Sequence, residues 1–212
     1  QVIEKAHTMH PNDVELNTVK GSLLSFFGRF EEAIEILQST LGYAEDKSEV
    51  YYNIGLTYQT NSKFREAISA YKNAIEQNIN HESALYELAY CLDVLGELED
   101  SVEYYKQFID RDPYSSYAWY NLGIVYNKLE RYEEAIKAYD FALVIDDTFS
   151  SAYFNMGNSY MNLEKYPEAL EAYKSTLSNE GPSAETNCCI GTAYEKLEQY
   201  ELAIKYYRKA SK

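Results

Sequence analysis

The sequence predicts an all-α solenoid of six helix-turn-helix repeats, and a strict internal period is the first reason. Small residues recur every 34 positions without an insertion, at Gly21, Gly55, Ala89, Gly123, Gly157 and Gly191. The second reason is that apolar residues recur at i, i+3, i+4 and i+7 in two stretches of each period, which indicates two amphipathic helices. Because one helix pair cannot bury both of its faces, neighbouring pairs must stack.

The period predicts a single solenoid domain over residues 1–212, with a leading partial repeat before the six repeats. The repeats are 14–47, 48–81, 82–115, 116–149, 150–183 and 184–212. Residues 1–13 continue the same register, with Ala6 and Pro11 at late positions of a repeat. We therefore expect the end of a preceding repeat there, in a chain excised from a longer protein.

Each repeat carries signals for its two helices and for the turn between them. A second small residue follows the first by twelve positions, at Ala33, Ala67, Ser101, Ala135, Ala169 and Ala203. Two facing small residues let antiparallel helices approach closely. In the turns, Gly28 and Gly96 suit the left-handed residue that ends a helix, and Ser62 stands at the equivalent position. Pro167 falls at the start of a second helix, where its missing N–H costs nothing.

The residues around these small positions resemble the tetratricopeptide repeat family. The fourth repeat reads Trp119-x-x-Leu122-Gly123-x-x-Tyr126, followed by Ala135-x-x-x-Tyr139. The second and fifth repeats carry the same first-helix pattern, as Tyr51, Ile54, Gly55, Tyr58 and Tyr153, Met156, Gly157, Tyr160. The resemblance covers essentially the whole chain. It implies an alpha-alpha superhelix whose inner groove is lined by the first helix of each repeat, and a non-catalytic role in holding other proteins.

The resemblance also implies which positions line the groove: the second, fifth, sixth, ninth, twelfth and thirteenth of each repeat. Three asparagines share the sixth position and a fourth stands at a ninth position, as Asn53, Asn121, Asn155 and Asn158. An amide can donate to one backbone carbonyl and accept from one backbone N–H, so the row suits an extended peptide of any sequence. Aromatic side chains beside it are expected to anchor the ligand, at Tyr52, Tyr86, Tyr90, Tyr117, Tyr120 and Phe154.

Two alternatives to this groove hypothesis stay open. Most of the 23 tyrosines fill core positions of the repeat, and an asparagine in mid-helix is often simply solvated. The chain could also be an architectural rod that spaces or assembles other domains and has no specific ligand in its groove.

Charge limits the class of partner. The formal net charge is −15, with 19 Lys and Arg against 34 Asp and Glu, which argues against a nucleic-acid backbone as partner. In the family, a subtype that grips chaperone tails needs Lys and Arg at groove positions where this chain has none. The acids on the inner wall are Glu15, Glu49, Glu87, Asp93, Glu185 and Glu195, and the cations are Lys128 and Lys196. A neutral or basic protein segment is therefore favoured, and uncapped ends favour head-to-tail self-association.

Catalysis has no recognisable motif in the sequence. The three histidines (His7, His10 and His81) form no cluster, and the three cysteines (Cys91, Cys188 and Cys189) lack metal-ligand spacing. Gly-rich phosphate loops and nucleophile motifs are absent. No apolar run approaches the roughly 18 residues of a membrane helix, and no signal peptide begins the chain. We expect no enzyme activity, no cofactor, no metal and no membrane partner, and a cytoplasmic location.

Overall fold

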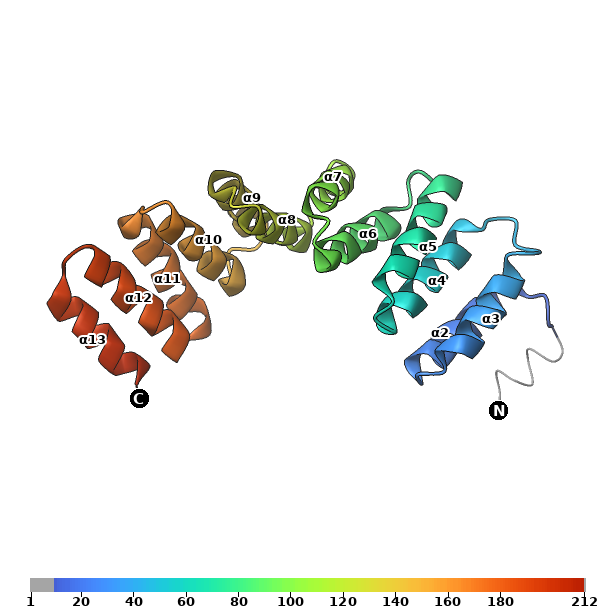
Figure 1. Ribbon diagram of the computed structural model, residues 1–212, viewed down its shortest axis with the longest axis horizontal. Helices are drawn as coiled ribbons and strands as arrows, with labels where there is room; N and C mark the ends of the chain where they lie inside the picture. Colours follow the sequence, from blue (N-terminus) through green and yellow to red (C-terminus); the bar gives the residue numbers. More distant parts are fainter. Residues whose placement is uncertain (1–9, 212) are drawn as a thin grey trace. The chain divides into compact units, whose positions relative to one another are not determined.

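The computed structural model describes residues 10–211, which contain twelve α-helices and no strand (Figure 1). The helices are α2 (Val14–Phe26), α3 (Phe30–Thr40), α4 (Ser48–Thr60), α5 (Phe64–Gln77), α6 (Glu82–Leu95), α7 (Leu98–Ile109), α8 (Ser116–Lys128), α9 (Tyr132–Ile145), α10 (Ser150–Asn162), α11 (Tyr166–Glu180), α12 (Ala184–Lys196) and α13 (Tyr200–Ala210). The predicted all-α solenoid is confirmed. The helix expected at residues 1–10 falls almost entirely outside the described residues.

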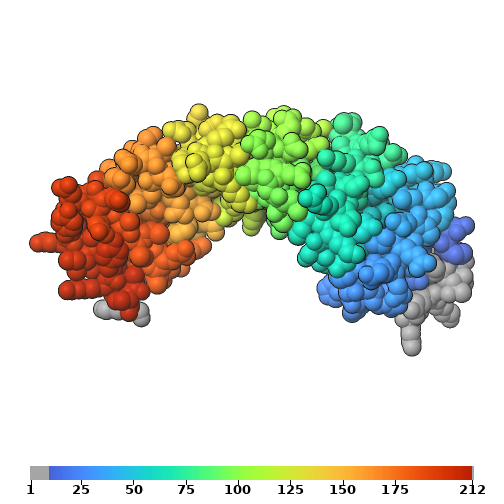
Figure 2. All heavy atoms as spheres, viewed as in Figure 1, coloured from blue at the N-terminus to red at the C-terminus, as the bar shows by residue number. Residues whose placement is uncertain are grey.

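The chain forms two units, residues 1–111 and 112–212, and each unit is a stack of three helix pairs. The pairs are α2–α3, α4–α5 and α6–α7 in the first unit, and α8–α9, α10–α11 and α12–α13 in the second (Figure 1). Within each unit, successive pairs follow one another in chain order (Figure 2).

First helices of neighbouring pairs also contact each other. These contacts join α2 to α4, α4 to α6, and α8 to α10. The second helices α3, α5, α9 and α11 each pack between their own partner and the next first helix of the same unit. Each unit therefore has one face made by first helices, which we call the first-helix face, and an opposite face made by second helices.

In the pairs α4–α5, α8–α9 and α10–α11, the two helices approach closely because a glycine of the first faces a buried tyrosine of the second. A Cβ atom added at Gly123 would lie 2.5 Å from Cε1 of Tyr139, and one at Gly157 would lie 2.6 Å from Cε1 of Tyr173. Both tyrosines are almost completely buried. The small residues were predicted to allow a close approach of the two helices, and these distances show that approach.

All six turns within the pairs have the same hydrogen-bonding pattern, that of the Schellman motif. In the first of them, the N–H of Arg29 donates to the Leu24 carbonyl and the N–H of Gly28 donates to the Ser25 carbonyl. The residue at the Gly28 position has a positive φ in every repeat. It is glycine only at Gly28 and Gly96, and elsewhere it is Ser62, Glu130, Glu164 or Glu198.

Candidate peptide-binding face of the first helices

A half-buried aromatic residue recurs at the fifth position of four first helices, and each packs on the second-helix aromatic of its own pair. The ring centroids are 5.9 Å apart for Tyr52–Tyr71, 5.8 Å for Tyr86–Tyr105, 5.9 Å for Tyr120–Tyr139 and 5.7 Å for Phe154–Tyr173. The side chain on the first-helix face is therefore backed by a buried ring in each of these four repeats. Rings held in this way lose little conformational entropy when they contact a ligand.

Residues next to the fifth-position rings hold them further. Tyr52 lies against the His81 ring at 5.0 Å, and Tyr120 lies against Phe149 at 4.7 Å. Burial raises the pKa of both phenols. Like ordinary phenols, both hydroxyl groups are protonated at neutral pH and can donate hydrogen bonds.

Two other predicted aromatics are more accessible. Tyr117 is 64% exposed at the start of α8, with its ring 5.1 Å from Phe149. Tyr90 is 39% exposed in the middle of α6. Of the six predicted aromatics, these two are the most exposed, so they can contact a partner and can be substituted with little effect on core packing.

The predicted asparagines are half-buried, and each already interacts within the protein. Asn53 Nδ2 donates to the Glu49 carbonyl at 2.7 Å, and Asn53 Oδ1 accepts from Ser22 Oγ at 3.2 Å. Asn155 Nδ2 donates to the Tyr120 hydroxyl at 3.0 Å. Asn121 also has an interaction partner. An amide has two N–H donors and an oxygen with two lone pairs, so the Asn53 and Asn155 amides can each make further hydrogen bonds.

Asn158 has a different environment from the other three. Its Oδ1 accepts from the Tyr173 hydroxyl at 2.8 Å, so this amide supports the second-helix tyrosine of its own pair. The structure thus brings Asn155 and Tyr120 together across two repeats, and it directs the Asn158 oxygen toward the interior of its own pair.

The sequence analysis did not identify the polar residues that hold the other second-helix tyrosines, of which Tyr71 and Tyr139 are buried and Tyr207 is half-buried. Tyr71 Oη donates to Gln59 Oε1 at 2.6 Å, Asn127 Nδ2 donates to Tyr139 Oη at 2.8 Å, and Tyr207 Oη donates to Glu195 Oε2 at 2.6 Å. Each polar residue precedes its tyrosine by twelve positions. That recurring spacing is the signal by which the sequence could have revealed them.

The first-helix face carries more acidic than basic side chains. Glu15, Glu49, Glu185 and Glu195 are exposed, and Glu87 is half-buried and accepts from Gln59 Nε2 at 2.7 Å. The basic residues Lys128 and Lys196 are also exposed. Across residues 10–211, no group of three or more His, Cys, Asp or Glu side chains is placed to hold a metal ion. In the same range, every helix is too short or too polar to cross a bilayer.

These observations define a helical-hairpin repeat protein with a regular aromatic and amide surface on one face. Family models described as tetratricopeptide repeat match residues 52–116, 116–149, 150–179 and 184–212. The chain belongs to the tetratricopeptide repeat family, a family of protein-interaction scaffolds.

Solved structures give the same fold. A crystal structure of MamA protein has a TM-score of 0.76 at 29% identity, over 79% of this chain and 91% of that one. A second MamA crystal structure has a TM-score of 0.72 at 30% identity, over 74% of this chain and 92% of that one. YrrB, described as a tetratricopeptide repeat protein with an unusual peptide-binding site, has a TM-score of 0.71 at 18% identity, over 98% of both chains. A search of curated proteins found no match.

Proposed function

We propose that the first-helix face of each unit binds an extended segment of another protein, and that the chain acts without catalysing a reaction. The observation that carries this proposal is the repeated aromatic pair, in which a half-buried ring stands on a buried ring in four repeats. Such rings are rigid and amphipathic, and side chains of this kind dominate binding energy at protein interfaces.

The amides add a means of holding the peptide backbone. Asn53 and Asn155 keep hydrogen-bonding capacity beyond their partners in the protein. Each hydrogen bond to a ligand backbone contributes about 1 kcal/mol net, which is enough to fix the register without specifying a sequence. The structurally similar YrrB, a tetratricopeptide repeat protein with an unusual peptide-binding site, supports the same class of ligand.

The acidic face favours a neutral or basic segment. Glu15, Glu49 and Glu185 are exposed on first helices of the two units. An acidic ligand would meet like charges there, which raises the free energy of the complex and slows association. The same argument disfavours nucleic acid as the partner.

Selection from a phage-displayed random peptide library against the purified chain tests the proposal. We expect selected peptides to lose roughly tenfold or more in affinity for the double variant Tyr90→Ala with Tyr117→Ala, because truncating interface aromatics removes contact area. The matched control is Val144→Ala, which truncates an 80% exposed side chain of the second helix α9. Circular dichroism of all variants checks that they remain folded.

The alternative function, an architectural rod, predicts a different outcome. No peptide would be enriched, or the enriched peptides would bind the double variant and the wild-type chain equally. Either result would overturn the groove proposal and favour the rod. A triple variant with alanine at Asn53, Asn121 and Asn155 then tests the amides, with its free energy of unfolding measured alongside, since Asn53 and Asn155 also link neighbouring first helices.

A further inference from the structure

The second helices of the first unit carry a furrow that the proposed function does not use. One pocket, of about 300 Å³, lies between α3 and the C-terminal half of α4 and includes Ile34, Tyr58 and Lys63. A second pocket, of about 250 Å³, lies between α3, α4 and α5 and includes Leu41, Ile54 and Ala70. Both pockets are lined by Gln38 and Tyr58, so they form one continuous depression, which we call the α3–α5 furrow.

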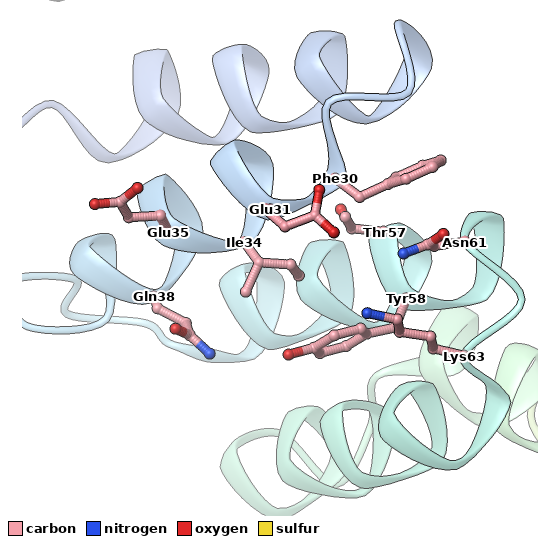
Figure 3. Close-up of a pocket in the computed structure, with 9 residues that line it drawn as sticks. All are labelled: Phe30, Glu31, Ile34, Glu35, Gln38, Thr57, Tyr58, Asn61 and Lys63. Carbon is pink, nitrogen blue, oxygen red and sulfur yellow. The ribbon is translucent and has the colours of Figure 1, made fainter.

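The floor of the furrow is apolar. Figure 3 shows Ile34 pointing from α3 toward the Tyr58 ring, with Phe30 at one end of the same helix. In the adjoining pocket, Tyr51 and the buried Ile54 continue the surface. A ligand with aliphatic side chains would remove this surface from water, at roughly 25 cal/mol per Å².

The shortness of α3 opens the furrow at one end. This helix has 11 residues, whereas α5 and α9 have 14 and α11 has 15. The chain leaves the helix after Thr40 through successive tight turns, in which the N–H groups of Leu41 and Gly42 donate to the carbonyls of Gln38 and Ser39. The final turn of helix that α5, α9 and α11 possess is therefore missing beside Leu41, where the second pocket lies.

The rim of the furrow is acidic. The lining residues include Glu31 and Glu35 of α3 and Glu66 of α5, against the one ammonium group of Lys63. Within the described part of the chain, none of these three carboxylates forms an ion pair, and the nearby Arg29 is paired with Glu32 at 2.5 Å. The helix α3 itself contains no Lys or Arg, and Lys137 of α9 occupies the position that corresponds to Glu35.

We propose that the α3–α5 furrow is a second binding site, which accepts a cationic amphipathic segment of another protein. Its aliphatic side chains would pack on Ile34 and Tyr58, and its Lys or Arg side chains would pair with the unpaired carboxylates of the rim. Electrostatic complementarity of this kind selects the partner and its register. The furrow lies on the second-helix face, so this site is separate from the proposed groove.

A designed probe tests the furrow directly: a fluorescein-labelled 14-residue peptide of Leu and Lys at helical spacing, titrated by fluorescence anisotropy. We expect the furrow variant Glu31→Lys with Glu66→Lys to weaken binding by roughly tenfold, because each carboxylate–cation contact is replaced by repulsion. We expect Ile34→Ala to weaken binding about fivefold, because aliphatic contact is lost. A peptide with Glu in place of Lys should not bind.

The net charge of −15 makes a charge-matched control essential, since a cationic peptide is attracted to any acidic surface. Glu133→Lys with Glu168→Lys makes the same two changes at the same repeat positions of α9 and α11. Ile136→Ala is the corresponding aliphatic control. Binding that is lost equally in both charge variants, that is unaffected by Ile34→Ala, or that is absent in the wild-type chain would overturn the proposal. The variant Tyr90→Ala with Tyr117→Ala should leave this binding unchanged, so the two proposed sites can fail independently.

Discussion

The Asn127 amide nitrogen donates a hydrogen bond to the hydroxyl of Tyr139 at 2.8 Å. The oxygen of the same amide accepts from Ser159 Oγ in the next repeat, also at 2.8 Å. One side chain therefore joins the two helices of its own pair and links that pair to its neighbour. Tyr139 is fully buried, so a hydroxyl that lost this hydrogen bond would have little access to water.

Replacing this amide should destabilise the second unit. We expect Asn127→Ala to lower the free energy of unfolding by about 1–3 kcal/mol, since it leaves buried polar groups unpaired. Urea denaturation followed by circular dichroism measures the change. Asn162→Ala is the control, because Asn162 is exposed and bonds only a carbonyl of its own helix. If the two variants lost the same free energy of unfolding, the hydrogen bonds of Asn127 would contribute no more to stability than the exposed bond of Asn162.

The contact between Gly157 and Tyr173 should reverse the usual effect of a glycine-to-alanine change. Alanine is favoured over glycine in a helix by about 1 kcal/mol. At Gly157, however, the new Cβ would lie 2.6 Å from Cε1 of Tyr173, and the buried ring must shift. We expect Gly157→Ala to lower the free energy of unfolding by about 1–3 kcal/mol. Ser178→Ala, at an exposed position of α11, should be neutral or stabilising in the same urea experiment.

A substitution at the left-handed residue of a turn should instead raise the free energy of unfolding. Glu164 has a φ of 58°, a conformation in which glycine has no steric penalty. We expect Glu164→Gly to raise the free energy of unfolding by about 0.5–1 kcal/mol and Gly96→Ala to lower it by a similar amount. Thermal denaturation of both variants measures the effect. A lower melting temperature for Glu164→Gly would contradict the prediction.

The three cysteines should differ in reactivity. Cys188 is exposed, whereas Cys91 is buried and burial raises the pKa of its thiol to about 12. We expect an aromatic disulfide reagent at pH 8 to modify Cys188 rapidly and Cys91 only when the chain unfolds, because the thiolate is the reacting species. Mass spectrometry of the modified peptides identifies the sites. Fast modification of Cys91 in the native protein would contradict the buried position.

The raised pKa of Cys91 also has a consequence for stability at high pH. The unfolded thiol ionises near its ordinary pKa of 9.0. The neutral thiol is favoured in the folded protein, so its contribution to stability is complete below that pH. The contribution is lost as the pH rises toward 12. Cys91→Ala should therefore unfold with a weaker pH dependence than the wild-type chain between these two values.

The repeat architecture was predictable because its signals are local and are repeated six times. The spacing from Gly157 to Ala169 and from Ala169 to Tyr173 recurs with small substitutions in every repeat, so one ambiguous repeat is corrected by the others. The turns at Gly28 and Gly96 were predictable for the same reason. The left-handed conformation of Glu130 was not, because glutamate has no preference for it and the packing of the two helices imposes it.

The partners of the polar side chains were not predictable from spacing alone. Asn155 and Asn158 lie one helical turn apart, yet one donates to Tyr120 and the other accepts from Tyr173. The difference depends on side-chain rotamers and on how neighbouring pairs stack. Asn17 gives a similar case, since this buried amide bonds the Pro11 carbonyl and the hydroxyl of Tyr43, which lies 26 residues further along the chain.

If the first-helix face binds a peptide as proposed, the hydrogen bond from Asn155 to Tyr120 would couple ligand binding to the stiffness of the second unit. This hydrogen bond joins α8 to α10 and so links two consecutive helix pairs. A bound peptide that formed its own hydrogen bond with the Asn155 amide would weaken this bond. The two helix pairs could then rotate about the interface between them. Peptide binding at the first-helix face would then change the stiffness of the second unit. A mechanical measurement of that stiffness could therefore detect the bound peptide.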